Sequence, residues 1–297
     1  MYKRQSLVNG KGEKLPGVED GFLAGPGNQS HLMGRIASLC YARFVKNGTP
    51  LALVSTDNCS HNGDKLKAGV MAYVDAWKQA GKVDDDFVSY MEEKVSFPWS
   101  MIDKITPRPD EKVKEMLEKD GFEDTDLIIT SRNTYTAPFV NSEETGYLVI
   151  EDNFPNGRPP LEKAGIVFTD RETVDKVEKM KVCTCLNPLH TALAIYGCML
   201  GHTSIHDEME DKELSQLIQK MCYEEAMSVV VNPGVIDPKE FANAVLTKRL
   251  PNPFMPDTPQ RIVTDTSQKL PIRFGETIKS YIASDSLDVQ SLSLIHI

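Results

Sequence analysis

Apolar residues recur every three to four positions between residues 31 and 46, which predicts an amphipathic helix that ends at Asn47-Gly48. A short apolar run over residues 50–55 is typical of a buried parallel strand. Residues 1–30 carry many Gly, Asn and Lys residues and little periodicity, so we expect a loop there with at most one short strand. Similar patterns predict helices over residues 63–80, 84–95 and 110–120, and strands over residues 127–130, 147–150 and 166–169.

The strand pattern stops near residue 171, and the chain after it reads as helix. Turns that contain Pro and Gly, such as Asn232-Pro233-Gly234, separate the helices. A change from mixed strands and helices to helices alone marks a domain boundary, so the predicted fold class is α/β plus all-α. The predicted helices span residues 171–183, 188–201, 208–229, 237–249 and 258–284.

Composition describes an ordinary globular chain. With 297 residues, of which 40% are hydrophobic and 26% charged, the chain is long enough for two domains. The net charge of −10 and the pI near 5.2 argue against nucleic acid as a partner. No apolar run reaches the roughly 18 residues that span a bilayer, and no signal core follows the N-terminus. We therefore predict a cytoplasmic protein without a membrane span.

No metal site is predicted. Cys183 and Cys185 form a C-x-C pair that lacks zinc-finger spacing, and the six cysteines read as reduced, mostly buried thiols. His202 and His206 are four residues apart with Glu208 nearby, which is similar to a metal-binding pair. We interpret them as surface or turn residues.

The segment from Glu178 to His190 carries the strongest chemical signal, because Lys181, Asn187 and His190 meet at the start of an apolar helix. A lysine acts as a general base near neutral pH when burial or neighbouring charge lowers its pKa. An amide and an imidazole can then hold the oxygen that gains or loses the proton. The same residues also suit a solvated lysine, a helix cap and a buried structural histidine, so both interpretations stay open.

Several sequence blocks in a fixed order identify the chain as similar to a known family. Four of them span residues 55–63, 97–107, 150–159 and 178–190, and a weaker fifth spans residues 265–274. In this order they resemble the long-chain mannitol dehydrogenase and fructuronate (D-mannonate) oxidoreductase family. The resemblance implies a partial Rossmann-type dinucleotide-binding domain over residues 1–153. It implies a helical substrate domain over residues 154–290, similar to the C-terminal domain of 6-phosphogluconate dehydrogenase.

Both ends of the chain depart from that pattern. A dinucleotide domain needs a Gly-rich turn after its first strand, but no G-x-G-x-x-G is present, and Gly25-Pro26-Gly27 lacks the preceding apolar strand. The resemblance places this fingerprint upstream of Met1, so we expect an N-terminally truncated fragment that is inactive alone. Residues 291–297 resemble a translated sequencing adapter and are expected to be a non-native tail.

The resemblance also assigns the catalytic roles. It implies that Lys181 is the general acid/base and that Asn187 and His190 hydrogen-bond the reacting oxygen. Glu178, one turn earlier, is expected to tune the lysine or relay its proton, or else to form an exposed charge pair. The family usually has five steps between the Lys and the Asn, but this chain has six, followed by Pro188. We expect the helix to restart with Asn187 as its N-cap, or the extra residue to form a π-bulge. Lys179 stays open as an alternative base.

Further residues match substrate and cofactor positions of the family. Asn58 and Asn62 follow the predicted buried strand, where one is expected to reach the substrate or the nicotinamide ribose, with Asp57 beside the cofactor. Their alternative role is a loop turn. Asp103 matches an acid near the site, or forms a salt bridge. Arg261 and Lys269 match substrate contacts, or form a solvated basic stripe.

The leading hypothesis is an NAD- or NADP-dependent oxidoreductase that transfers hydride between nicotinamide and a hexuronate or aldonate such as fructuronate or mannonate. A hexitol (mannitol) 2-dehydrogenase is the runner-up in the same class. The competing class is a non-catalytic protein on a degenerate dehydrogenase scaffold, which would lack the Lys, Asn, His and Arg set that is present here. The expected partner is a small sugar acid or polyol.

Overall fold

The structure is a computed structural model that describes residues 6–131, 133–255 and 257–293. The chain forms two compact units. Unit 1 comprises Met1–Ile102 and Leu148–Asp175, and unit 2 comprises Asp103–Tyr147 and Lys176–Ile297. The segment between residues 103 and 147 therefore belongs with the helical part of the chain. The domain division at residue 153 stays a prediction.

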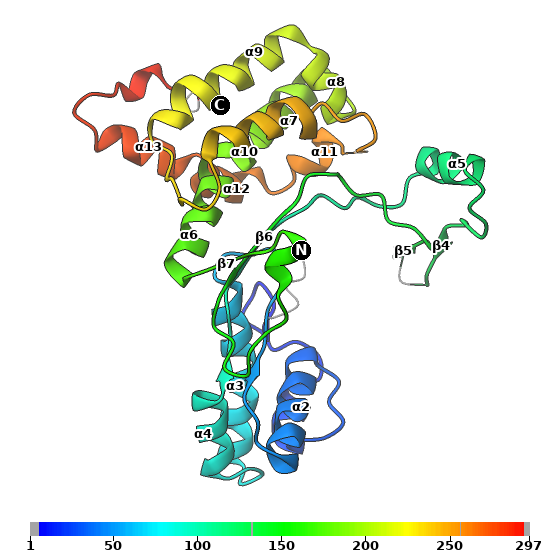
Figure 1. Cartoon of the computed structure of the whole chain (residues 1–297), viewed down its shortest axis with the longest axis vertical. Helices are drawn as coiled ribbons and strands as arrows, with labels where there is room; N and C mark the ends of the chain where they lie inside the picture. The colour runs from blue at the N-terminus through cyan, green and yellow to red at the C-terminus, as the bar shows by residue number, and fades with distance from the viewer. Residues whose placement is uncertain (1–5, 132, 256, 294–297) are drawn as a thin grey trace. The chain divides into compact units, whose positions relative to one another are not determined.

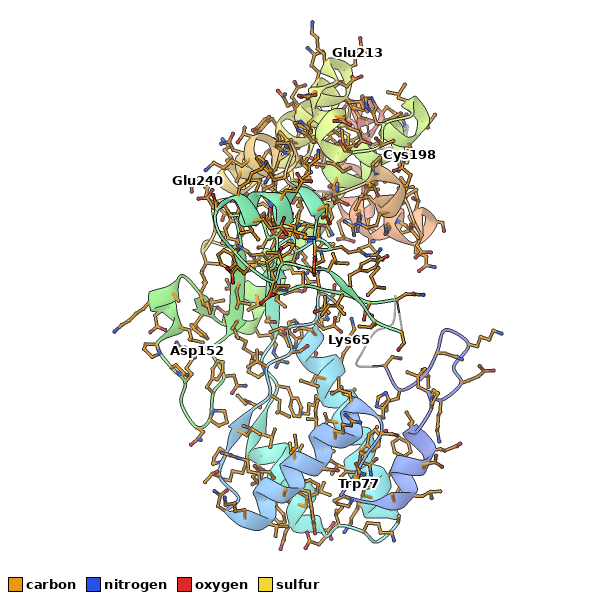
Figure 2. The ribbon with its side chains drawn as sticks, turned by 90° about the vertical axis from the view of Figure 1, so that its right-hand side faces the viewer. Lys65, Trp77, Asp152, Cys198, Glu213 and Glu240 are labelled. Atoms are coloured by element: carbon orange, nitrogen blue, oxygen red, sulfur yellow. The ribbon has the colours of Figure 1, made fainter. Side chains whose placement is uncertain are left out.

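Unit 1 is built around one long helix. Helix α3 (Asn62–Gln79) packs on α1 (Val18–Ala24), α2 (Leu32–Lys46) and α4 (Asp85–Glu93), as Figure 1 shows for α2, α3 and α4. The aromatic residues Tyr73, Trp77 and Phe87 are fully buried between these helices. Figure 2 shows Lys65 and Trp77 toward opposite ends of α3. Helices α2, α3 and α4 confirm the helices that hydrophobic spacing predicted in this part of the chain.

Helix α1 corrects the expectation of a loop over residues 1–30. Seven residues give too little periodicity to predict a helix, and tertiary contacts hold this one in place. The indole Nε1 of Trp77 donates to the backbone oxygen of Gly21 at 2.8 Å. A side chain at Gly21 would meet Gln29 Oε1 at 2.2 Å, so only glycine allows the helix to approach this closely.

The strands of unit 1 are short. Strand β1 (Leu51–Ala52) pairs in parallel with β2 (Val95–Ser96), and a second sheet has the order β3 (Ser100–Asp103), β6 (Tyr147–Glu151) and β7 (Val167–Thr169). Strands β6 and β7 are parallel. The predicted strand over residues 50–55 is only two residues long, and β2 and β3 were not predicted. A strand extends only as far as its partner pairs with it, which the pattern of one segment does not reveal.

Unit 2 begins with peripheral elements and continues as helices. Helix α5 (Glu111–Lys119) precedes an antiparallel pair of exposed strands, β4 (Ile128–Ile129) and β5 (Tyr135–Thr136). Helix α6 (Arg171–Lys179) begins in unit 1 and ends in unit 2. The elements that follow it are a π-helical segment Met180–Cys185, α7 (Asn187–Leu200), α8 (Ile205–Glu210), α9 (Lys212–Lys220), a π-helical segment Met221–Glu225, α10 (Pro238–Ala244), a π-helical segment Val245–Arg249, α11 (Pro259–Ile262), α12 (Thr266–Arg273) and α13 (Gly275–Ile282).

Two predicted helices are divided in the structure. The one over residues 208–229 breaks at Asp211, whose side chain accepts from the backbone N–H groups of Glu213 and Leu214 and so caps α9. The one over residues 258–284 is three short helices, with Asp265 at a φ of 58° between α11 and α12. The side-chain cap at Asp211 and the left-handed backbone at Asp265 outweigh the apolar periodicity that suggested continuous helices.

The helical run Arg171–Leu200 contains a window apolar enough to cross a membrane by length and composition. The expectation that no segment reaches that threshold is therefore wrong. In the structure 61% of this window is buried, as in a core helix of a globular protein.

The expected non-native tail is partly described. Leu292 is fully buried, and Ser293 donates from its backbone and hydroxyl to the carboxylate of Glu225. Residues 294–297 lie outside the described residues. That the tail is non-native stays a prediction.

Candidate functional site

Lys181 lies in the π-helical segment Met180–Cys185 with only 3% of its surface exposed. Burial lowers the pKa of its ammonium group. The carboxylates of Asp103 and Glu178 oppose this effect, and the charge of Arg249 adds to it. By contrast, Lys179 is exposed. Lys181 is thus a buried lysine whose proton is held less tightly than usual.

The neighbours of Lys181 form a buried ion cluster that the sequence did not predict. We call Asp103, Glu143 and Arg249 the Arg249 cluster. The guanidinium of Arg249 donates to both oxygens of Asp103 at 2.7 and 2.9 Å, and to both oxygens of Glu143 at 2.7 and 2.8 Å. Burial acts against its charge, but these hydrogen bonds outweigh burial and raise the pKa of Arg249. In the sequence Arg249 directly follows Lys248, and nothing in the pattern distinguishes the buried charge from its exposed neighbour.

The charges of this cluster bear on the proton of Lys181. Asp103 and Glu143 contribute two negative charges and Arg249 one positive charge, so the cluster carries one net negative charge. A protonated Lys181 balances that charge, whereas burial favours the neutral amine. The two effects oppose each other, which suits a group that both gives and takes a proton. Asp103, predicted as an acid near the site or a salt-bridge residue, lies in the salt bridge and acts on Lys181.

The start of α7 agrees with the predicted disruption near Pro188. The π-helical segment Met180–Cys185 absorbs the extra residue between Lys181 and Asn187, which confirms the π-bulge. The helix restarts as expected, but Leu186 is the N-cap and Asn187 is the first helical residue. Pro188 occupies the first turn, where its missing N–H costs no helical hydrogen bond. Among the described residues, none accepts from or donates to the side-chain amide of Asn187.

His190 and Arg261 share a carboxylate that sequence reasoning missed. His190 Nε2 lies 3.3 Å from Asp257 Oδ2, without the alignment of a hydrogen bond. Arg261 donates to Asp257 Oδ1 from Nε at 2.9 Å and from Nη2 at 2.5 Å. Burial acts to raise the pKa of Asp257, but His190 and Arg261 outweigh it and lower the pKa. Asp257 is therefore ionised, and its hydrogen bonds orient Arg261.

Lys269, the second predicted substrate contact, lies near Arg261. Its Nζ donates to the backbone oxygen of Ile262 at 2.8 Å. Burial lowers its pKa, and the charges of Arg273 and Arg261 add to this. The structure thus brings Arg261 and Lys269, the two predicted substrate contacts, close together in unit 2.

The two candidate asparagines of unit 1 differ in solvent exposure. Asn62 is 1% exposed, and its amide is hydrogen-bonded to Ser55, Asp57 and Ser100, so it fixes the loop after β1. Asn58 is exposed. Asn62 therefore has the alternative role of a loop residue, and the ligand role of Asn58 stays a prediction.

Asp57 lies at a pocket of about 330 Å³ near the end of β1. Its Oδ2 is buried and accepts no hydrogen bond from any described residue. Ser6, Cys59 and Lys65 also line the pocket. Open α/β sheets bind ligands beyond the carboxyl ends of their strands, and a vacant carboxylate acceptor suits the hydroxyl groups of a ribose. The residues present at this pocket fit part of a dinucleotide cofactor.

The residues near His206 resemble a metal-binding pair in the sequence, and the structure shows exposed acids there together with one buried acid. His206, Asp207 and Glu210 place their ligand atoms within 4.8 Å of one another, but both acids are exposed, as is common without a metal. Glu208 contradicts the expectation of a surface or turn residue. It is fully buried, and its carboxylate has no hydrogen-bond partner among the described residues.

Replacement of Glu208 by Gln is expected to remove a pH dependence of stability. Burial, with the charges of Asp257 and Asp207, raises the pKa of Glu208 from 4.5 to about 8. Below pH 4.5 the carboxyl is neutral in the folded and unfolded states. Between pH 4.5 and 8 only the unfolded chain ionises, so the wild type loses up to about 4–5 kcal/mol relative to the variant. Unfolding measured from pH 4 to 9 tests this, and parallel curves for both proteins contradict it.

Replacement of Gly197 by Ala is expected to destabilise unit 2 by about 1–3 kcal/mol through overpacking. The added Cβ would lie 1.5 Å from Glu208 Oε1 and 2.1 Å from its Cδ. Gly275→Ala is the matched control, because no atom lies within 4 Å of its added Cβ. Chemical denaturation of both variants measures the difference. Equal stability of the two variants would show that Glu208 moves aside freely.

Two domain families match this chain. The profile of the mannitol dehydrogenase Rossmann domain matches residues 23–163, and the profile of the mannitol dehydrogenase C-terminal domain matches residues 173–295. The predicted fold class and the resemblance stated from the sequence blocks are confirmed by these matches.

Among known proteins, a D-mannonate oxidoreductase of Thermotoga maritima is 52% identical over 295 residues, which cover 99% of this chain and 54% of that protein. A D-sorbitol dehydrogenase in substrate-free form has the same fold, with a TM-score of 0.80 at 24% identity over 96% of this chain and 55% of its own. The ternary complex of Pseudomonas fluorescens mannitol 2-dehydrogenase with NAD and D-mannitol has a TM-score of 0.70 at 25% identity, covering 94% and 53%. The chain spans about half the length of these relatives.

Proposed function

The chain belongs to the mannitol dehydrogenase family, and from this premise we propose a function for the whole protein. It is an NAD- or NADP-dependent oxidoreductase that interconverts the carbinol and the carbonyl of a sugar acid such as mannonate and fructuronate. The observation that carries the proposal is the burial of Lys181 beside the Arg249 cluster, where burial lowers its pKa and the carboxylate of Asp103 opposes that effect. A solvated structural lysine would show neither feature.

The reaction requires one proton and one hydride to leave the carbinol. The neutral amine of Lys181 takes the hydroxyl proton during oxidation, and its ammonium returns that proton to the carbonyl oxygen during reduction. A bound nicotinamide accepts or supplies the hydride. Asp57 and Asn58 are the residues that hold part of the cofactor. The exposed Lys179 is the weaker candidate, because burial, which lowers the pKa of Lys181, does not act on a side chain that faces solvent.

The polar residues at the start of α7 complement this lysine. The amide of Asn187 is available to hydrogen-bond the reacting oxygen. His190 Nε2 lies 3.3 Å from Asp257 Oδ2, so the imidazole is beside a negative charge. Both groups polarise the carbonyl in the reduction direction.

A sugar acid is favoured over a hexitol because the relative with 52% identity carries the name D-mannonate oxidoreductase. A hexitol is the second candidate, because D-mannitol is bound in the mannitol 2-dehydrogenase structure. Turnover of mannonate, fructuronate, mannitol and fructose by the whole protein tests both. We expect kcat/KM for the sugar acids to exceed that for mannitol and fructose. A preference for mannitol establishes the alternative, and absence of turnover with all four contradicts both.

A further inference from the structure

Arg273 is a partly buried cation beside the residues at the start of α7. It ends α12, and its Nη1 donates to the hydroxyl of Thr191. Thr191 is fully buried and follows His190 directly in the chain. The guanidinium is therefore anchored to α7, at the residue that follows His190.

The charge of Arg273 is not neutralised by an acid. Among the described residues, no carboxylate lies within 4.0 Å of its guanidinium, whereas Arg249 meets two carboxylates and Arg261 meets Asp257. Burial lowers the pKa of Arg273 without an opposing acid, and its charge lowers the pKa of Lys269 in turn. Two cations thus lie near each other in a partly desolvated place, which favours an anionic ligand.

The geometry of the guanidinium points to a carboxylate. A guanidinium has five N–H donors, and one of those of Arg273 is directed to Thr191. The remaining donors suit the two oxygens of one carboxylate. A neutral polyol offers only hydroxyl groups and leaves the positive charge of Arg273 unbalanced. Arg261, which the sequence suggested for this role, already donates twice to Asp257.

We propose that Arg273, with Lys269 beside it, binds the carboxylate of the sugar acid and selects it over the corresponding neutral polyol. This inference rests on the proposed oxidoreductase function and names the residue that sets its substrate class. The hydroxyl of Thr191 positions the guanidinium.

Steady-state kinetics of the whole protein with mannonate and mannitol test the proposal. Arg273→Gln is expected to raise KM for mannonate roughly 10- to 100-fold, the effect typical of a lost charge-assisted hydrogen bond, with kcat changed less than about threefold. KM for mannitol is expected to stay within about twofold. Arg273→Lys keeps the charge but loses the planar fork, so its KM should lie between those of the wild type and Arg273→Gln.

Lys279→Gln is the control for removal of one positive charge, because Lys279 is exposed on α13 and pairs with Glu276. It should leave both substrates unaffected. An unchanged KM for mannonate in Arg273→Gln, or an equal rise for both substrates, overturns the proposal. Calorimetric titration with mannonate measures the same site without turnover, and equal affinity of the wild type and Arg273→Gln also overturns it. A wild type that binds mannonate but turns over neither substrate would instead refute the proposed function.

Discussion

Lys181→Met in the whole protein is expected to lower kcat for sugar-acid oxidation about 10²- to 10⁴-fold, the range typical of a lost general base. Met keeps the length of the side chain and suits a residue that is 3% exposed, so the fold should survive. Lys179→Met is the matched control two residues away, on the exposed side of the helix. It should change kcat by less than about twofold. A larger loss in Lys179→Met than in Lys181→Met would show that Lys179 is the base.

The pH profile of the same variants separates proton transfer from structural damage. Oxidation needs the neutral amine, so the rate should rise with pH through the pKa of Lys181 and then level off. Burial places that pKa below the usual 10.5, and the rising limb should lie correspondingly lower. The limb should disappear in Lys181→Met. Its persistence in this variant would assign it to another group.

Sequence patterns gave the long helices and the lysine but not its surroundings. The periodicity of apolar residues predicted α2, α3 and α7 because each buries one continuous face. The family block around Lys181 carried its candidate role, and its six-residue spacing to Asn187 predicted the local π-helix. These features depend on residues close together in the chain.

The Arg249 cluster shows why the rest was missed. Arg249 is 106 residues from Glu143 and 146 residues from Asp103 along the chain. An ion pair over such a separation leaves no periodic trace. Only Asp103 was predicted, whereas Glu143 and Arg249 each look like an ordinary surface charge in the sequence. Asp257 and Glu208 were missed for the same reason, because their burial is set by the packing of α7, α8 and α11. The short strands depend likewise on partners elsewhere in the chain.

Removal of Arg249 is expected to cause the largest loss of stability in unit 2. Arg249→Met leaves Asp103 and Glu143 buried with two negative charges, and breaking a buried pair in this way typically costs about 3–5 kcal/mol. The loss should be measured as the free energy of unfolding in urea. The Arg249→Met substitution should also raise the pKa of Lys181, because the charge of Arg249 acts to lower it. The rising limb of the pH profile should therefore move to higher pH.

The double variant Arg249→Met, Glu143→Gln separates the effect of unbalanced charge from the effect of the lost guanidinium. It leaves Asp103 as the one acid of the cluster, opposite the ammonium of Lys181, so the balance of charge is restored without the guanidinium. We expect it to be more stable than Arg249→Met alone, and its pH profile to lie closer to that of the wild type. If the double variant is no more stable than the single one, the cluster acts through its hydrogen-bond geometry. The charge balance proposed around Lys181 would then be wrong, because Glu143 would not contribute to it.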